Sequence, residues 1–408
     1  MLTVTALVQV FFSLHSIAET SLLFVKIGYN AELLPPENIP WDLYDHLDYF
    51  VAKTGPNPES DIVIENETNL KVVASAAKSH NVTISLSIGG WTGSKYFSSL
   101  VASEQSRKTF AESILRVVKK YELDGIDIDW EFPNQPGDEG NQISKDDSSN
   151  FLKFLSILRQ ILGPKARLSA AVSVKGFSGP DGQYLTDLKD FGEVLDFITI
   201  MAYDIFGPGF SSVSGPNAPL FDTCNEPTAK FSVSRAIKNW ISTGFPASKI
   251  LLGIPGYGYQ YQLLDSSLNK SDFSGKSNKT SFIFNQISKG AASSTNIKVS
   301  SFKGPKNCGG PVEGYNWLFK DLINCGLLSP DAEKGLNGFE RHYDNCSHTP
   351  FLFNPSSKTL ISYDDPRSLA LKAKYSKSKG LAGINLFDAT GDTQDQILLK
   401  AVKSKLTN

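Results

Sequence analysis

The sequence has few of the residues that usually mark metal, redox or nucleic-acid chemistry. Its 408 residues include 5 histidines and 4 cysteines, and the formal net charge is −2. No histidine pair has metal-ligand spacing, and neither a Cys-x-x-Cys pair nor a zinc pattern occurs. Runs rich in Lys and Arg are also missing, so nothing points to nucleic acid or to an anionic membrane surface. We therefore expect no metal and no cofactor, and neither nucleic acid nor a membrane as a partner.

Long apolar runs are scarce as well. After the first 18 residues, no run approaches the length that is needed to cross a bilayer. Residues 1–18 are uncharged and apolar, and they end in Ser16-Ile17-Ala18, which places small residues before a cut at Glu19. This pattern is typical of a secretory signal peptide, and its apolar core is too short for a membrane anchor. We expect a secreted, extracellular chain.

The cysteines and the glycosylation sequons agree with export. In an oxidising compartment four cysteines predict two disulfides, and the sequence leaves their pairing open. The cysteines are Cys224, Cys308, Cys325 and Cys346. Asn-x-Ser/Thr sequons occur at Asn66, Asn81, Asn269, Asn278 and Asn345, which predicts a glycoprotein. Asn81 is the least favourable acceptor, because a predicted strand follows it directly.

Short apolar strands alternate with helical patterns along most of the chain. Strands are predicted over residues 22–29, 46–53, 82–88, 123–132, 168–172, 197–203, 250–255 and 383–387. Helical spacing predicts helices over residues 67–80, 104–121, 148–162, about 228–244 and 366–379. This alternation favours an α/β fold of the (β/α)8 TIM-barrel type over an open doubly wound sheet. The Gly256-Tyr257-Gly258-Tyr259 segment lacks the further glycine of a dinucleotide fingerprint.

An additional segment lies between the seventh and eighth predicted strands. From residue 259 to residue 354, Ser, Asn and Lys increase, and a helical stretch at 315–325 is flanked by short β-like runs. We interpret 259–354 as a small α+β subdomain that is inserted into a catalytic barrel of residues 19–258 and 355–408. Such insertions rise from the C-terminal face of a barrel, where active sites form, so we expect it to wall one side of a cleft.

The fourth predicted strand carries acids within an apolar sequence. In an extended chain Asp127, Asp129 and Glu131 point to one face, about 6.6 Å apart in succession, while the Ile and Trp residues between them point to the other. Carboxylates at this spacing do not all ionise comfortably, so at least one should hold a proton at neutral pH. That is the condition for a general acid.

The acidic strand resembles the signature of the family 18 glycoside hydrolases, the chitinases and their relatives. The pattern Asp-x-x-Asp-x-Asp-x-Glu falls at Asp124, Asp127, Asp129 and Glu131. Other segments are similar to family motifs: Ser87-Ile88-Gly89-Gly90-Trp91, Met201-Ala202-Tyr203-Asp204, Gly215-Pro216-Asn217-Ala218-Pro219-Leu220 and Ser362-Tyr363-Asp364-Asp365-Pro366. They follow in the family's order, and the resemblance covers most of the chain.

The resemblance implies a retaining mechanism in which the N-acetyl carbonyl of the substrate is the nucleophile. Glu131 would be the general acid and later the base, and Asp129 would accept hydrogen bonds from the acetamido N–H and from Glu131. Asp127 would share a proton with Asp129, and Tyr203 would donate its hydroxyl to the carbonyl. Asp124 is interpreted as structural.

The remaining expected contacts are substrate-binding residues. They are Tyr29, Trp91, Met201, Asp204, Tyr257 and Phe387. Trp91 is expected at the rim of the site as a stacking platform. The sequence departs from the family at two positions: Phe387 stands where a Trp usually forms the floor under the sugar, and Tyr259 stands where many members have an Arg. A Phe offers a smaller stacking face than a Trp and has no indole donor.

These features predict a monomeric, secreted chitinase that binds chitin or chitooligosaccharides and hydrolyses β-1,4-linked N-acetylglucosamine polymers. An endo-β-N-acetylglucosaminidase acting on N-glycan cores would use the same acids, but a deep walled cleft suits a linear polymer better. A chitinase-like lectin is the non-catalytic alternative. In such proteins the acid at the position of Glu131 is typically replaced, and here it is present.

Overall fold

The part of the chain that can be described in this computed structural model comprises residues 21–27, 34–59, 62–222, 231–271, 281–283, 308, 310–311 and 315–407. The predicted signal peptide 1–18 lies outside it, as do Tyr29, Cys224 and the sequon at Asn278. Within these residues, no helix combines the length and the apolar character that crossing a bilayer requires.

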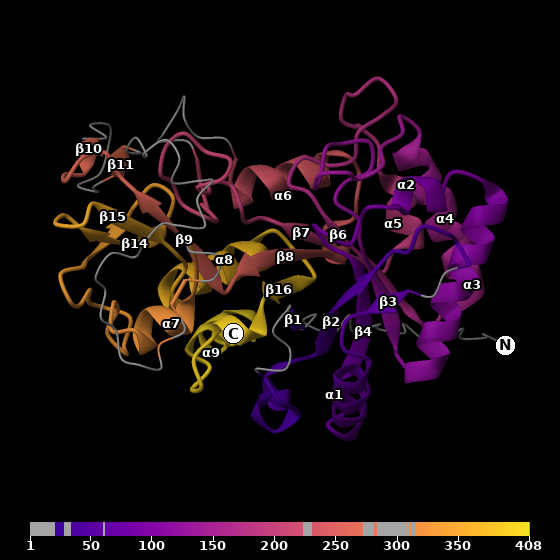
Figure 1. The fold of residues 1–408 in the computed structure, drawn as a ribbon, viewed down its shortest axis with the longest axis horizontal. Helices are drawn as coiled ribbons and strands as arrows, with labels where there is room; N and C mark the ends of the chain where they lie inside the picture. The colour runs from indigo at the N-terminus through magenta and orange to yellow at the C-terminus, as the bar shows by residue number, and fades with distance from the viewer. Residues whose placement is uncertain are drawn as a thin grey trace, which may run out of the picture.

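A closed barrel of parallel strands forms the body of the molecule (Figure 1), which confirms the predicted (β/α)8 fold. The ring closes because β1 pairs with both β2 and β16. The barrel strands are β1 (Leu22–Ile27), β2 (His46–Lys53), β4 (Thr83–Gly89), β5 (Gly125–Asp129), β6 (Arg167–Val172), β7 (Phe197–Met201), β8 (Ile250–Pro255) and β16 (Gly383–Phe387). A short antiparallel strand, β3 (Val63–Ile64), extends β2.

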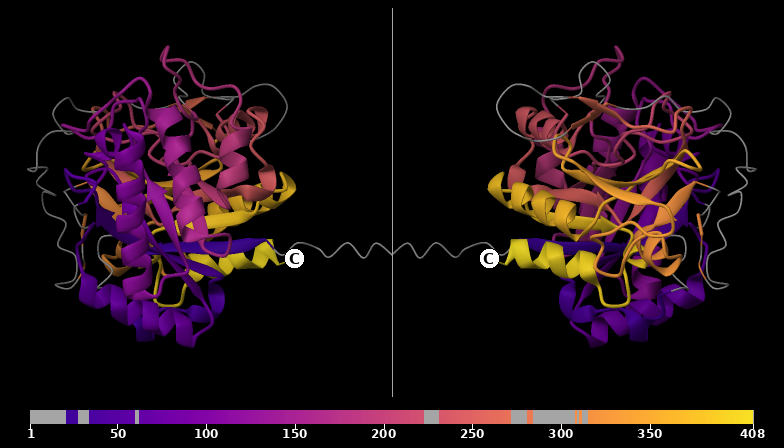
Figure 2. Two further views of the ribbon diagram at one scale, coloured as in Figure 1. Left: turned by 90° about the vertical axis from the view of Figure 1, so that its right-hand side faces the viewer. Right: turned by 90° about the vertical axis from the view of Figure 1, so that its left-hand side faces the viewer.

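Helices surround the barrel (Figures 1 and 2). They are α1 (Glu67–Ser79), α2 (Phe97–Leu100), α3 (Glu104–Tyr121), α4 (Asp147–Leu162), α5 (Lys189–Val194), α6 (Val233–Ser242), α8 (Pro366–Ser378) and α9 (Ile397–Leu406). Single 3-10 turns occur at η2 (Pro36–Asn38), η3 (Trp41–Leu43), η4 (Ala247–Lys249) and η5 (Ala389–Gly391). All five predicted helices are present, but α6 begins later than predicted, because the side chain of Ser232 caps its first turn. The helices α2, α5 and α9 were not predicted.

The outer face of β5 explains why its acids point inward. Ile126 and Ile128 are completely buried in the apolar layer between the barrel and the helices. Trp130 stacks on Phe97 at 5.2 Å between ring centroids and meets Phe151 edge-on at 5.4 Å. Burying a large apolar side chain contributes about 1.5–3 kcal/mol, so this face is strongly fixed and the alternate residues must face the barrel interior.

The segment between β8 and α8 forms a second, antiparallel sheet beside the barrel (Figure 1). Its strand order is β12-β9-β15-β14-β13. The elements are β9 (Tyr257–Gln262), β12 (Asn316–Leu318), α7 (Phe319–Asn324), β13 (Glu340–Asp344), β14 (Thr349–Asn354) and β15 (Thr359–Ser362), and β10 (Asn269–Ser271) pairs separately with β11 (Ser281–Ile283). The sheet extends beyond the predicted insertion of residues 259–354, because β9 begins at Tyr257 and β15 ends at Ser362. Because β9 directly follows β8, the insertion leaves the barrel at its C-terminal face.

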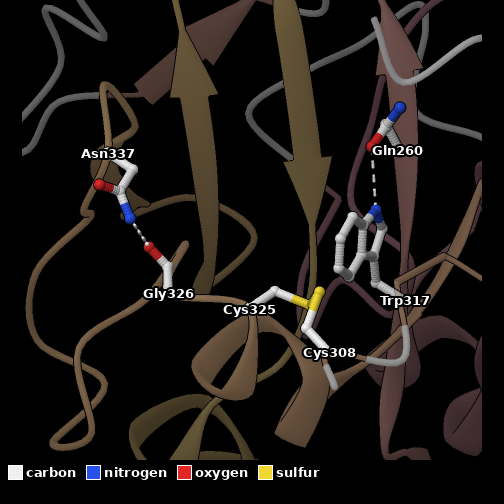
Figure 3. The surroundings of a disulfide bond; sticks show 6 residues. All are labelled: Gln260, Cys308, Trp317, Cys325, Gly326 and Asn337. Carbon is white, nitrogen blue, oxygen red and sulfur yellow. Dashed lines mark hydrogen bonds between the residues drawn. A yellow bond between two sulfur atoms is a disulfide. The ribbon is translucent and has the colours of Figure 1, made fainter. Parts of the chain in front are cut away.

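A disulfide joins Cys308 to Cys325 at the end of α7 in this insertion (Figure 3). Near it, the indole N–H of Trp317 donates to Oε1 of Gln260 at 2.9 Å, which links β12 to β9. The sequence predicted disulfides but left their pairing open, and this bond identifies one of the pairs. Cys346 is disulfide-bonded as well, which agrees with the prediction of a second disulfide.

Candidate active site

Asp127 and Asp129 point into the barrel from β5, and both are buried. The hydroxyl of Ser87, on the neighbouring strand β4, donates to Oδ2 of Asp127 at 2.8 Å. On the other side, the hydroxyl of Ser169 on β6 donates to Oδ1 at 2.8 Å. Both oxygens of Asp127 are therefore bonded to adjacent strands, and Asp129 lies one step closer to the C-terminal mouth.

Glu131 lies just beyond β5, which ends at Asp129. Its backbone N–H donates to Oγ of Ser94 at 3.0 Å, and its carbonyl accepts from Nδ2 of Asn141 at 3.1 Å. Both sides of the residue are thus held by loops at the barrel mouth. The side chain is partly buried.

The two glycines at the end of β4 allow a close approach to this segment. The N–H of Gly90 donates to the carbonyl of Asp129 at 2.7 Å. Gly89 has a φ of +118°, and a Cβ there would lie 2.1 Å from the same carbonyl oxygen, so only glycine fits. Trp91 follows directly and is 47 % exposed. Its predicted role as a stacking platform stays a prediction.

A lysine that the sequence analysis missed lies between the two aspartates. Lys26, on β1, donates to Oδ2 of Asp129 at 3.0 Å and to Oδ2 of Asp127 at 3.2 Å. It also donates to Oγ of Ser87 at 3.2 Å, and it is only 3 % exposed. In the described part of the chain no hydrogen bond joins Asp127 to Asp129, and each of them accepts from Lys26 instead. The sharing of a proton between the two aspartates stays a prediction. A charged residue within an apolar strand was the signal available in the sequence.

The pKa of Glu131 is raised well above its usual value. Burial is the main cause, the negative charges of Asp129 and Asp204 add to it, and Lys26 opposes it. A carboxyl group that stays protonated near neutral pH is what general acid catalysis requires. The shift therefore falls on the residue predicted to be the general acid.

An aromatic cluster lies beside the acids. The ring of Tyr203, just after β7, is stacked with Phe387 at the end of β16, with 5.9 Å between centroids. Tyr257 meets both rings edge-on at 6.1 Å, and Phe50 meets Phe387 at 5.7 Å. Burial raises the pKa of Tyr203 well above its usual value, and the charge of Asp129 adds to this although Lys26 opposes it. The hydroxyl of Tyr203 therefore remains a hydrogen-bond donor at neutral pH.

The insertion contributes two hydroxyls to the same region. Tyr257 and Tyr259, both on β9, donate to Oδ1 of Asp204 at 2.6 Å each. The backbone N–H of Asp204 donates to Oδ1 of Asn217 at 2.8 Å, which fixes the loop in a left-handed conformation with φ of +55°. Tyr259, which stands where many family members have an Arg, thus ties the inserted sheet to the loop after β7.

The other predicted residues lie at different depths. Met201 is the last residue of β7 and is partly buried. Asp124 is exposed at the opposite, N-terminal end of β5, where its Oδ2 accepts the N–H of Ile84 at 2.8 Å. This contact supports the structural interpretation of Asp124. Among the described residues no group of three or more His, Cys, Asp or Glu side chains is placed to hold a metal ion.

A (β/α)8 barrel with three acids on and just after one strand, and a tyrosine after another, defines a glycoside hydrolase barrel. A match to the model of glycosyl hydrolases family 18 covers residues 10–392, and the chain belongs to that family.

Both curated proteins and solved structures agree with this assignment. The chain is 36 % identical to a "chitinase-like effector" of Moniliophthora roreri, over 92 % of this chain and 90 % of that protein. It is 30 % identical to chitinase A1 of Niallia circulans, over 80 % of this chain and 43 % of that protein. The crystal structure of a chitinase from Rhizomucor miehei is similar with a TM-score of 0.79 at 30 % identity, and the match covers 94 % of this chain and 99 % of that chain.

Proposed function

We propose that the chain is a chitinase, which hydrolyses β-1,4-linked N-acetylglucosamine polymers with retention of configuration. The observation that carries this proposal is the pair formed by Glu131 and Asp129. The pKa of Glu131 is raised well above its usual value, mainly by burial. The buried Oδ1 of Asp129 has no hydrogen-bond partner among the described residues. A protonated acid and an unused carboxylate oxygen at the mouth of one strand are what an acetamide-assisted reaction needs.

In this mechanism Glu131 gives its proton to the glycosidic oxygen as the bond from that oxygen to the anomeric carbon breaks. The carbonyl oxygen of the substrate's acetamide forms the new bond to that carbon, while Oδ1 of Asp129 accepts the acetamido N–H and balances the positive charge. Tyr203 donates to the carbonyl oxygen and orients it. Glu131, now ionised, then removes a proton from the water that opens the ring intermediate, which restores the starting state.

The products of chitohexaose test this proposal. Proton NMR at early times should show shorter oligomers whose new reducing ends are in the β configuration. Cellohexaose, which has the same linkage but no acetamide, should remain intact. New reducing ends in the α configuration would contradict the substrate-assisted mechanism, and the distribution of products reports whether cleavage is internal or from an end.

A non-catalytic chitin-binding function is the second candidate. It is favoured by the name "chitinase-like effector" given to relatives that cover 92 % of this chain, in Moniliophthora roreri and Moniliophthora perniciosa. Calorimetric binding of chitohexaose without any product over a wide pH range would support it over hydrolysis. Release of glycans from an N-glycoprotein, with chitohexaose intact, would instead favour an endo-β-N-acetylglucosaminidase.

We also infer that the chain is exported and glycosylated. The apolar opening of residues 1–18 and the sequons support this inference. The disulfide between Cys308 and Cys325 adds to it, because disulfides persist mainly in oxidising compartments.

Replacing Asp204 by Asn is expected to move the alkaline limb of kcat/KM to lower pH. The charge of Asp204 contributes to the raised pKa of Glu131, so its removal lets that carboxyl ionise at lower pH. Activity depends on protonated Glu131, and it is therefore full below the pKa of the folded state and lost as the pH rises through it. The pH profile with a soluble chitooligosaccharide measures the shift.

Asp187→Asn is the matched control. Asp187 is exposed, and its carboxyl group pairs with Nζ of Lys189 at 3.6 Å and accepts the backbone N–H of the same residue. Its profile should coincide with that of the wild type. An alkaline limb that stays in place in Asp204→Asn would contradict the role of Asp204, whatever the change in KM.

A further inference from the structure

Lys26 is held deep inside the barrel with all its donors in use. An ammonium group has three N–H donors, and those of Lys26 reach Asp127, Asp129 and Ser87 at 3.0–3.2 Å. The hydroxyl of Ser87 in turn donates to Oδ2 of Asp127 at 2.8 Å. The ring of Phe50 covers the ammonium group, with 5.1 Å from Nζ to the ring centroid. The ammonium group of Lys26 is thus surrounded by groups that stabilise a positive charge, and the mechanism proposed above assigns it no role.

The charges that face Lys26 come from several elements of the barrel. They are the carboxyl groups of Asp48 on β2, Asp127 and Asp129 on β5, and Glu131 after β5, together with the hydroxyl of Tyr203 after β7. Asp48 has partners of its own, since it accepts from Nδ2 of Asn385 at 2.9 Å and lies 3.2 Å from Nε2 of His46. The pair Asp127 and Asp129 is therefore the direct counter-charge of Lys26.

Lys26 stays positively charged throughout the neutral range. Burial lowers its pKa, but the charges of Asp129, Asp127 and Asp48 outweigh burial, and the pKa ends well above its usual value. Burial also raises the pKa of Asp127, and Lys26 opposes that rise. The hydrogen bonds to Asp127 from Ser87, Ser169 and Lys26 favour its ionised form.

Two carboxylates that lie close together in a buried site commonly share one proton, which leaves the pair with a single negative charge. One ammonium group between two ionised carboxylates gives the same net charge without a shared proton. We propose that Lys26 is a positioning residue that takes the place of this proton, so that Lys26, Asp127 and Asp129 together keep one net negative charge independent of pH. The contact also turns Oδ2 of Asp129 toward β1 and leaves Oδ1 for the substrate.

The charge assigned to Lys26, Asp127 and Asp129 follows from the geometry of the folded protein. Only its expected effect on turnover rests on the proposed function. A shared proton is gained and lost as the pH changes, whereas the charge of Lys26 is constant. The variant Lys26→Met keeps most of the side-chain volume and removes the charge, so the pair should then take up one proton. Lys26→Arg keeps the charge and should behave as the wild type does.

Carbon-13 NMR of protein labelled at the aspartate carboxyl carbons tests the proposal. The signals of Asp127 and Asp129, assigned with the Asp127→Asn and Asp129→Asn variants, should be flat in the wild type between about pH 5 and pH 9. In Lys26→Met the two signals should titrate together in one step within this window. A joint step in the wild-type protein would overturn the proposal, and so would flat signals in a folded Lys26→Met protein.

The wild-type measurement decides the question even where Lys26→Met does not fold, because a shared proton would appear as a step in the wild type itself. Hydrolysis of chitohexaose is recorded in parallel. Flat carboxyl signals with no product would leave the charge assignment intact and contradict only the proposed function. A joint step with normal product formation would do the reverse. In active protein, Lys26→Met should add an ionisation to the pH profile of kcat/KM that Lys26→Arg lacks.

Discussion

Glu131→Gln should lower kcat on chitohexaose by about 10²–10⁴-fold, the usual contribution of a general acid, while the protein still binds the oligosaccharide. An amide has nearly the same shape as the carboxyl group but has no acidic proton to give to the leaving oxygen. The pKa of Glu131 is already raised by burial, so a neutral side chain at this position suits the local electrostatics and the fold should tolerate it. Steady-state kinetics and calorimetry measure the two effects separately.

The control for this variant is Glu122→Gln, at the end of α3. Glu122 is exposed and pairs with Lys78 at 2.6 Å, and an exposed pair of this kind contributes little to stability. The control should retain wild-type kcat and affinity. If Glu131→Gln also kept its turnover, the assignment of the general acid would fail. If the wild-type protein bound the oligosaccharide without cleaving it, the binding function would replace the proposed hydrolysis.

Lys372→Met is expected to reduce the free energy of unfolding by about 3–5 kcal/mol at neutral pH, the cost of leaving a buried charge without its partner. Lys372, on α8, forms an ion pair with Asp364, and both side chains are completely buried. The hydroxyl of Ser368 donates to the same carboxyl oxygen at 2.6 Å, but it carries no charge. Urea denaturation measures the loss. The loss should shrink at low pH, because burial raises the pKa of Asp364 and a protonated carboxyl no longer needs the lysine.

A second substitution separates the lost charge balance from lost packing. The double variant Asp364→Leu with Lys372→Met removes both charges, and it should recover most of the stability, since a buried ion pair is often replaced by apolar residues at little cost. Lys78→Met, which breaks the exposed pair with Glu122, should leave the free energy of unfolding close to that of the wild type. A double variant as unstable as Lys372→Met would contradict the electrostatic explanation.

The barrel could be predicted because its signal repeats along the chain. Each strand is a short apolar run followed by a turn, and α3 shows a clear helical period that ends where Glu122 adopts a left-handed conformation. The helices α2 and α5 were missed because Phe97–Leu100 and Lys189–Val194 are too short to show a period. The helix α9 was missed although its buried residues Leu398, Leu399, Val402 and Leu406 have helical spacing.

The orientation of the acids was predictable, but their partners were not. Alternation along β5 is a local property, and burial of Ile126 and Ile128 on one face dictates that Asp127 faces the other. The contact between Lys26 and Asp127 spans 101 residues of sequence, and the one between Tyr259 and Asp204 spans 55. Contacts of this range depend on how the barrel closes and on how β9 packs against it, which a pattern within one segment does not contain.

The two tyrosine hydroxyls on Asp204 couple the stability of the inserted sheet to the (β/α)8 barrel. Any opening of β9 releases both hydrogen bonds at once and leaves the carboxylate of Asp204 without these two hydroxyl donors. A ligand that binds only while β9 keeps these hydrogen bonds must also stabilise the sheet against unfolding. The free energy by which the ligand stabilises the sheet equals the free energy by which the folded sheet strengthens ligand binding. The insertion is in this sense not an interchangeable module, because its stability and the occupancy of the site are coupled.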